Sequence, residues 1–205
     1  MDMGNPLPAR DGCKSLAKFY KSNRKWKMTS FQMTPEQRSI LSLRERVYRV
    51  KKKMSQSGHV ISFAFNIPGA EKRPAWLSAI FKTLREELMD YFQNVCGVNI
   101  EDEFLYDTSA GCGFCCLVSQ VVTALELKKA AINFENNSVI GRILDIDVMD
   151  AYHGIISRSD LGYSERLCFL CDRKVSECIG RRHSIEQLIL YSEQCCKEYA
   201  ALKGI

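Results

Sequence analysis

The sequence predicts an α+β fold in which a mixed β-sheet is flanked by helices. Segments with helical periodicity alternate with short apolar runs typical of strands, without a strict repeat, and this pattern is typical of one sheet covered by helices. The length of 205 residues is sufficient for one sizeable hydrophobic core. We therefore expect a single domain over residues 31–205.

The first 30 residues differ from the rest of the chain in charge. They carry a net charge of +5, whereas the remaining residues hold 22 basic and 22 acidic side chains. A basic segment with few apolar residues cannot bury enough apolar area to fold, so we expect residues 1–30 to form a disordered basic extension. The balanced charge of the rest argues against a groove for a long polyanion, and no nucleic-acid partner is expected.

The apolar runs and the cysteines both indicate a cytoplasmic protein. The longest apolar runs, residues 60–67 and 114–118, are far too short to span a bilayer, and no secretory signal is recognisable. Adjacent cysteines at 115–116 and 195–196 are awkward for a disulfide framework. We expect reduced thiols, a cytoplasmic location and no membrane partner.

The first predicted elements are a helix and a buried strand. Thr34, Pro35 and Gln37 form a capping box with proline at the first helical position, so a helix should begin there and run toward residue 54. The β-branched and aromatic residues of 59–66 predict a buried strand. Residues 66–74 contain two prolines and a glycine and should form an irregular loop.

The middle of the chain predicts two helices around a pair of strands. Apolar residues at helical spacing indicate a helix over residues 75–95 with a wide buried face. A short strand at 103–106, a turn at 111–113 and a second strand at 114–118 should follow. Apolar residues at helical spacing then predict a second helix over residues 119–134.

The last third predicts two more strands and a final helix. An apolar run over residues 141–148 indicates a strand, and a further strand is expected at 152–157. Residues 158–162 should form a loop. A cysteine-rich turn then precedes an amphipathic helix over residues 184–202.

Two carboxylates, Asp145 and Asp147, interrupt the apolar run between Gly141 and Val148. Successive side chains of a strand point to opposite faces, so the two aspartates share a face, with their Cα atoms roughly 7 Å apart. Like charges this close repel unless a cation or a basic partner lies nearby. The pair is a candidate site for a divalent metal, and the alternative is an exposed edge strand with an acidic face.

Basic residues near predicted loops are candidates for phosphate contact. Asn66, Lys72 and Arg73 lie in the loop after the first strand, and Arg158 follows another strand. Arginine binds phosphate oxygens with two parallel hydrogen bonds, and lysine supplies a compact charge. Arg142 is three positions from Asp145, so a regular strand would turn it to the opposite face. The alternative for each basic side chain is a solvated surface charge.

The cysteine-rich turn holds a third candidate site. Cys168 and Cys171 have the spacing of zinc ligands, and Cys178 and His183 follow. Three thiolates and an imidazole can close a tetrahedral zinc site, and the alternative is a set of packed thiols with a surface histidine. A role for Cys171 as a nucleophile has less support because no orienting residue is identified.

Four motifs occur in order along the chain. They are Asn66-Ile67-Pro68-Gly69 with Lys72, Gly141-Arg142 through Asp145-Ile146-Asp147-Val148, Ser157-Arg158-x-Asp160-Leu161-Gly162, and Arg166-x-Cys168-x-x-Cys171 through Cys178 and Arg182-His183-Ser184. With these motifs the chain resembles, over about residues 35–195, the citrate lyase holo-acyl-carrier-protein synthase family, the apo-citrate lyase phosphoribosyl-dephospho-CoA transferases.

The resemblance implies a cytoplasmic, nucleotidyltransferase-like transferase. Such an enzyme moves phosphoribosyl-dephospho-CoA from triphosphoribosyl-dephospho-CoA to a serine of the citrate lyase acyl carrier protein, the gamma subunit, and releases diphosphate. Asp145 and Asp147 would then be catalytic and hold magnesium. The substrate would be bound by Asn66, Lys72, Arg73, Arg142 and Arg158.

Two other functions compete with this one. The first is the related transfer to the carrier protein of malonate decarboxylase, which uses the same precursor. The second is a non-enzymatic binding module, stabilised by zinc, that would need neither Asp145 nor Asp147.

Overall fold

A computed structural model describes residues 33–119, 121–178 and 182–205. The predicted basic extension, residues 1–30, lies outside the described residues. The chain forms these elements in order: α2 (Pro35–Met54), β1 (His59–Phe65), α3 (Leu77–Cys96), β2 (Ile100–Thr108), β3 (Gly111–Val118), α4 (Ala124–Asn137), η2 (Gly141–Ile143), β4 (Leu144–Asp150), β5 (Gly154–Ile156), η3 (Ser159–Leu161), α5 (Val175–Cys178) and α6 (Ile185–Lys203).

The five strands form one sheet in the order β2-β3-β1-β4-β5. The α+β class is confirmed, but the expected mixed sheet is wrong, because every neighbouring pair in this sheet is antiparallel. The hairpins β2-β3 and β4-β5 account for two of these pairs. Helix α3 connects β1 to β2, which run parallel with β3 between them, and α4 connects β3 to β4, which run parallel with β1 between them. Each is therefore a split β-α-β unit. No parallel strands therefore become neighbours.

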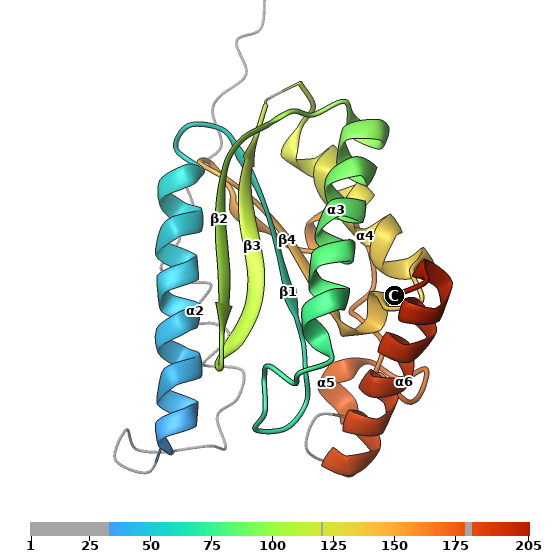
Figure 1. The fold of residues 1–205 in the computed structure, drawn as a ribbon. Coiled ribbons are helices and arrows are strands. Elements are labelled where there is room, and N and C mark those ends of the chain that lie inside the picture. The colour runs from blue at the N-terminus through green and yellow to red at the C-terminus, as the bar shows by residue number, and fades with distance from the viewer. Residues whose placement is uncertain (1–32, 120, 179–181) are drawn as a thin grey trace, which may run out of the picture.

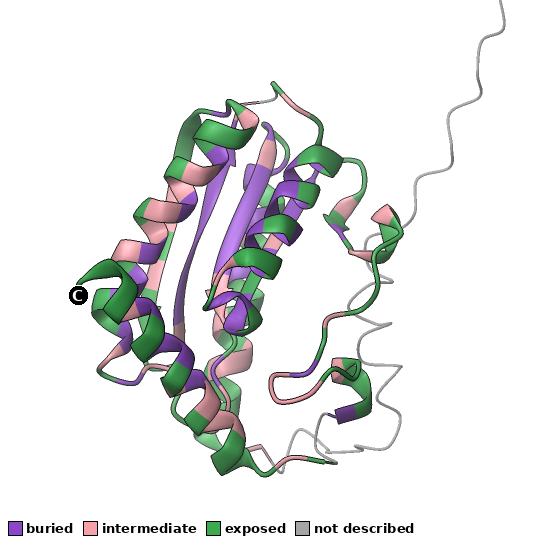
Figure 2. Ribbon diagram, turned by 90° about the vertical axis from the view of Figure 1, so that its right-hand side faces the viewer, coloured by how far each residue is buried: buried purple, intermediate pink, exposed green. Residues whose placement is uncertain are grey.

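Helices cover both faces of the sheet (Figure 1). Helix α2 lies alone on one face, and α3, α4 and α6 lie on the other. Strand alternation divides the core accordingly: Val60 and Met149 pack toward α2, whereas Ile61 and Ile146 pack toward α3 and α4. In Figure 2 the strands in the middle of the sheet are largely buried, while the long helices turn exposed residues outward. The edge strand β2 has no buried residue.

The element boundaries follow from local chemistry. The Thr34 and Gln37 capping box is confirmed at the start of α2. Helix α4 begins later than predicted, because Thr123 and Glu126 form its capping box. The predicted turn at residues 111–113 is wrong, since these residues begin β3. Gly113 is required inside that strand, because a Cβ there would clash with the Phe63 carbonyl oxygen and the Tyr106 hydroxyl.

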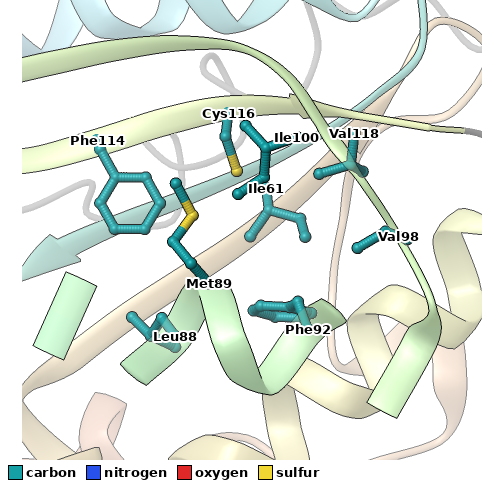
Figure 3. A pocket seen from close by; sticks show the side chains of 9 residues that line it. All are labelled: Ile61, Leu88, Met89, Phe92, Val98, Ile100, Phe114, Cys116 and Val118. Carbon is teal, nitrogen blue, oxygen red and sulfur yellow. The ribbon is translucent and has the colours of Figure 1, made fainter. Parts of the chain in front are cut away.

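The core between α3 and the sheet contains one narrow gap. Figure 3 shows Met89 and Phe92 of α3 facing Ile61 and Phe114 of the sheet around it. Its volume is about 10 Å³, so it could hold about one water molecule, and its apolar lining offers such a water no partners. We interpret it as a packing gap. None of the described helices is long and apolar enough to cross a membrane.

Candidate functional site

Asp145 and Asp147 lie on the same face of β4, as predicted from strand alternation. In the register with β1, Asp145 pairs with Ala64 and Asp147 pairs with Ser62, whereas Ile146 is fully buried on the opposite face. The Asp145 side chain is 53% exposed and that of Asp147 is 28% exposed. The two carboxylates are therefore accessible from the face that α2 covers.

Asp147 has a buried cationic partner on α2. The Lys51 ammonium lies 3.0 Å from Asp147 Oδ2 and also donates to Ser62 Oγ at 3.0 Å. Burial opposes ionisation of Asp147, but the Lys51 and Lys128 charges prevail and lower its pKa. Burial likewise opposes the Lys51 charge, yet the Asp147 carboxylate raises the Lys51 pKa above its usual value. Asp147 and Lys51 thus stabilise each other as an ion pair.

Asp145 is held by Arg166, which arrives from the segment after β5. The guanidinium lies 3.0 Å from Asp145 Oδ1 and donates to the Leu144 carbonyl oxygen at 2.6 Å. Desolvation and the neighbouring Asp147 charge nevertheless raise the pKa of Asp145, against the attraction of Arg166. The two aspartates thus differ in the direction of their pKa shifts: the pKa of Asp147 is lowered, which favours its ionised form, whereas that of Asp145 is raised.

Glu135 of α4 links this site to a second arginine. Its side chain is only 2% exposed and pairs with both Arg166 and Arg158, the latter at 2.5 Å. A buried carboxylate is tolerated when cations and hydrogen bonds satisfy it. A chain of alternating charges therefore runs from Asp145 through Arg166 and Glu135 to Arg158.

The side chains of α4 also hold the backbone of β4 between the two aspartates. Ile146 N–H donates to Glu135 Oε1 at 2.9 Å, and Lys128 Nζ donates to the Ile146 carbonyl oxygen at 2.7 Å. Strand β5 pairs only with residues 148–150 of β4. The Ile146 N–H and carbonyl oxygen on that edge therefore need partners outside the sheet, and the side chains of α4 supply them. The α4 contacts thereby fix the position of the carboxylate pair.

The backbone before β4 leaves the strand conformation and redirects Arg142. Gly141 begins the short helix η2, where a Cβ would clash with the Glu135 carbonyl oxygen. Arg142 donates to the carbonyl oxygens of Cys168 and Phe169 at 2.8 and 3.2 Å. It therefore contacts the cysteine-rich segment instead of the carboxylates, and its predicted role in substrate binding stays a prediction.

The other predicted substrate-binding residues already have partners within the protein. Lys72 donates to the Ile67 carbonyl oxygen at 2.5 Å. Arg73 pairs with Asp107 and donates to Ser78, and Arg158 pairs with Glu135. For Asn66 the contact is a backbone hydrogen bond to the Ile143 carbonyl oxygen at 2.7 Å, which ties this loop to the start of β4. Their roles toward a substrate stay predictions.

Sequence reasoning missed the charged residues that surround the carboxylates. Lys51 lies in a run of three lysines, and nothing in that run indicates which one faces the sheet. Lys128 and Glu135 lie in a helical segment where charges are usually exposed. Only Arg166 had a signal, since it belongs to the fourth motif.

The carboxylate pair is compatible in ligand type with magnesium. The ion pairs involve Oδ2 of Asp147 and Oδ1 of Asp145, and magnesium is commonly bound by one or two carboxylates that leave room for water and phosphate. Charge balance alone does not demand a metal, because Lys51 and Arg166 already supply cations.

The four predicted zinc ligands do converge. The ligand atoms of Cys168, Cys171, Cys178 and His183 all lie within 4.8 Å of one another. Hydrogen bonds from the Arg173 backbone N–H and His183 lower the pKa of the Cys171 thiol to about 7. Within the described ranges, no other cluster gathers three or more such ligand atoms.

Comparison with known proteins gives consistent matches. The family described as apo-citrate lyase phosphoribosyl-dephospho-CoA transferase matches residues 36–199. A probable apo-citrate lyase phosphoribosyl-dephospho-CoA transferase of Vibrio cholerae is 32% identical over 146 residues, covering 69% of this chain and 79% of that protein.

Two further relatives match shorter stretches. The apo-citrate lyase phosphoribosyl-dephospho-CoA transferase of Escherichia coli O7:K1 is 35% identical over 36% of this chain and 40% of its own length. Protein CitXG of Leuconostoc mesenteroides is 28% identical over 62% of this chain and 27% of its own length. With four-fifths of its length matched by one family, this chain belongs to the apo-citrate lyase phosphoribosyl-dephospho-CoA transferase family.

Proposed function

We propose that this protein transfers phosphoribosyl-dephospho-CoA from triphosphoribosyl-dephospho-CoA to a serine of the citrate lyase acyl carrier protein, with release of diphosphate. Membership of the transferase family supports the reaction class. The observation that carries the mechanism is the carboxylate pair Asp145 and Asp147 on β4, held between Lys51 and Arg166.

The reaction is a nucleotidyltransferase-type substitution at phosphorus. The serine oxygen attacks the phosphorus nearest the ribose, and the bond from that phosphorus to the departing diphosphate breaks. The serine proton leaves with solvent or a base. Because there is little covalent chemistry for the protein to perform, catalysis comes mainly from positioning and from charge stabilisation.

The residues of the site divide these tasks. Asp145 is the more exposed carboxylate and is the better placed to meet the reactants, whereas Asp147 is fixed by Lys51. Magnesium held by both carboxylates would neutralise charge on the attacking and leaving oxygens. Arg166 can turn one N–H toward a phosphate while it keeps Asp145 in place.

The loop residues would bind the triphosphate end of the precursor. Asn66 is tied to the start of β4, so the segment that carries Lys72 and Arg73 begins beside the carboxylates. Arg158, which pairs with Glu135, and Arg142, which contacts the Cys168 carbonyl oxygen, would have to turn part of their N–H groups toward the phosphates. Binding of phosphate would require Arg73 to exchange or share its Asp107 partner.

The decisive experiment measures the intact mass of the carrier. The protein is incubated with apo citrate lyase carrier, triphosphoribosyl-dephospho-CoA and magnesium. We expect a mass increase of one phosphoribosyl-dephospho-CoA group, and none on a carrier whose acceptor serine is alanine. No increase on the citrate lyase carrier, with an increase on the malonate decarboxylase carrier, would contradict the proposed acceptor.

A further inference from the structure

The cluster of Cys168, Cys171, Cys178 and His183 takes no part in the proposed transfer. These residues come from a hairpin, from α5 and from the residue before the cap of α6, and α5 and α6 lie at the same end of the molecule (Figure 1). We propose that the cluster binds one structural zinc ion, which holds the segment carrying Arg166 against the carboxylate site.

The distances within the cluster match a tetrahedral zinc site. Cys171 Sγ lies 3.5 Å from Cys178 Sγ and 3.5 Å from His183 Nε2. Zinc bonds of about 2.3 Å to sulfur and about 2.0 Å to nitrogen separate two sulfur ligands by about 3.8 Å, and a sulfur from a nitrogen by about 3.5 Å. These two spacings are close to the tetrahedral values, and all four ligand atoms lie within 4.8 Å of one another.

The cluster differs from the other cysteines of the protein. Cys112, Cys115, Cys116, Cys195 and Cys196 are buried among apolar side chains, where desolvation raises the pKa of their thiols. Cys171 and His183 are only half-buried and meet through their ligand atoms. Cys168 and Cys178 are buried as well, so the contact of Cys171 with the His183 imidazole is what separates this cluster from a set of inert packed thiols.

The ion would join α5 and the start of α6 to the hairpin whose first residue, Arg166, contacts Asp145. Cys168 N–H donates to the Arg173 carbonyl oxygen at 2.8 Å, and Val175 N–H donates to that of Arg166 at 2.9 Å, which closes the hairpin. Arg142 donates to the Cys168 carbonyl oxygen. A zinc ion bound to Cys168 and His183 would link this hairpin to the start of α6. Arg166 would then be held against Asp145 from a fixed position, with Arg142 of η2 anchoring the hairpin beside the start of β4.

The first test measures zinc in the purified protein. We expect about one equivalent per chain, retained in Cys96→Ser, whose thiol is half-buried and outside the cluster, and lost in Cys171→Ser. Replacement by cobalt(II) should give the absorption of a tetrahedral thiolate site in the unmodified protein, so the result does not depend on whether the variant folds. Zinc-free protein with a disulfide between Cys171 and Cys178, found by mass after alkylation, would overturn the proposal.

The second test measures what the ion holds in place. Zinc removal should lower the melting temperature by about 10 °C and should speed amide hydrogen exchange over residues 166–175, while exchange in β1 changes little. Equal exchange with and without zinc would overturn the positioning role. Neither readout uses carrier transfer, so failure of this proposal is distinguishable from failure of the proposed reaction.

Discussion

The carboxylate site and the cysteine cluster both gather metal-binding groups, but they balance charge differently. At the carboxylate site, Lys51 pairs with Asp147 and Arg166 pairs with Asp145, so the protein neutralises its own anions. In the cysteine cluster, the three sulfurs and the imidazole meet one another directly. The difference suggests that a metal at the first site would arrive with the substrate, whereas a metal at the second would belong to the fold.

This comparison predicts the largest effect on stability at Glu135, which balances two arginines at the carboxylate site. Glu135→Gln removes the charge but keeps the size, and it leaves Arg158 and Arg166 without a buried counter-ion. We expect a loss of about 3–5 kcal/mol in the free energy of unfolding, measured by urea denaturation. A loss below about 1 kcal/mol would show that the buried network is not needed.

The two aspartates should respond differently to loss of charge. Asp147→Asn leaves the buried Lys51 ammonium unpaired and should cost about 2–3 kcal/mol in the free energy of unfolding. Asp145→Asn removes a carboxylate whose pKa is raised, so stability at pH 7 should hold or rise by less than about 1 kcal/mol, because the side chain is half exposed. Equal losses in both variants would contradict the assigned partners.

Acid should remove the stability that Asp147 contributes. Its folded-state pKa is lowered, so the contribution is complete above the unfolded-state pKa of about 3.9 and is lost as the pH falls through the folded-state value. The stability difference between the unmodified protein and Asp147→Asn should therefore shrink below about pH 4. Denaturation curves between pH 3 and pH 7 measure it, and a difference that stays constant would argue against the ion pair.

The smallest effect is expected at an exposed ion pair. Glu45 and Arg49 on α2 lie 3.4 Å apart with side chains 70% and 79% exposed. Glu45→Gln should change the free energy of unfolding by less than about 0.5 kcal/mol. It is the matched control for Glu135→Gln and Asp147→Asn. A loss of unfolding free energy as large as theirs would mean that buried ion pairs contribute no more to stability than exposed ones.

The features that depend on nearby residues were predictable from sequence. The capping box of Thr34 and Gln37 and the shared face of Asp145 and Asp147 each follow from local spacing, and the cysteine spacing predicted which ligand atoms would meet. These patterns need no knowledge of the rest of the fold.

The features that depend on tertiary packing could not be predicted from the sequence. The antiparallel order of the sheet requires knowing which strand lies between β3 and β4. The partners Lys51 and Glu135 belong to helices far from β4 in the sequence, and only the packed structure shows which side chains of those helices are buried against it. Propensity and periodicity contain no information on such contacts.

The rate of carrier modification in Asp145→Asn tests the central claim most directly. Asp145 is half exposed and its replacement should leave the fold intact, so loss of rate reports on chemistry. Intact-mass time courses with the citrate lyase carrier, precursor and magnesium should show modification slowed at least about 100-fold, at an unchanged melting temperature. An unchanged rate would contradict the assignment of this carboxylate pair as the catalytic centre.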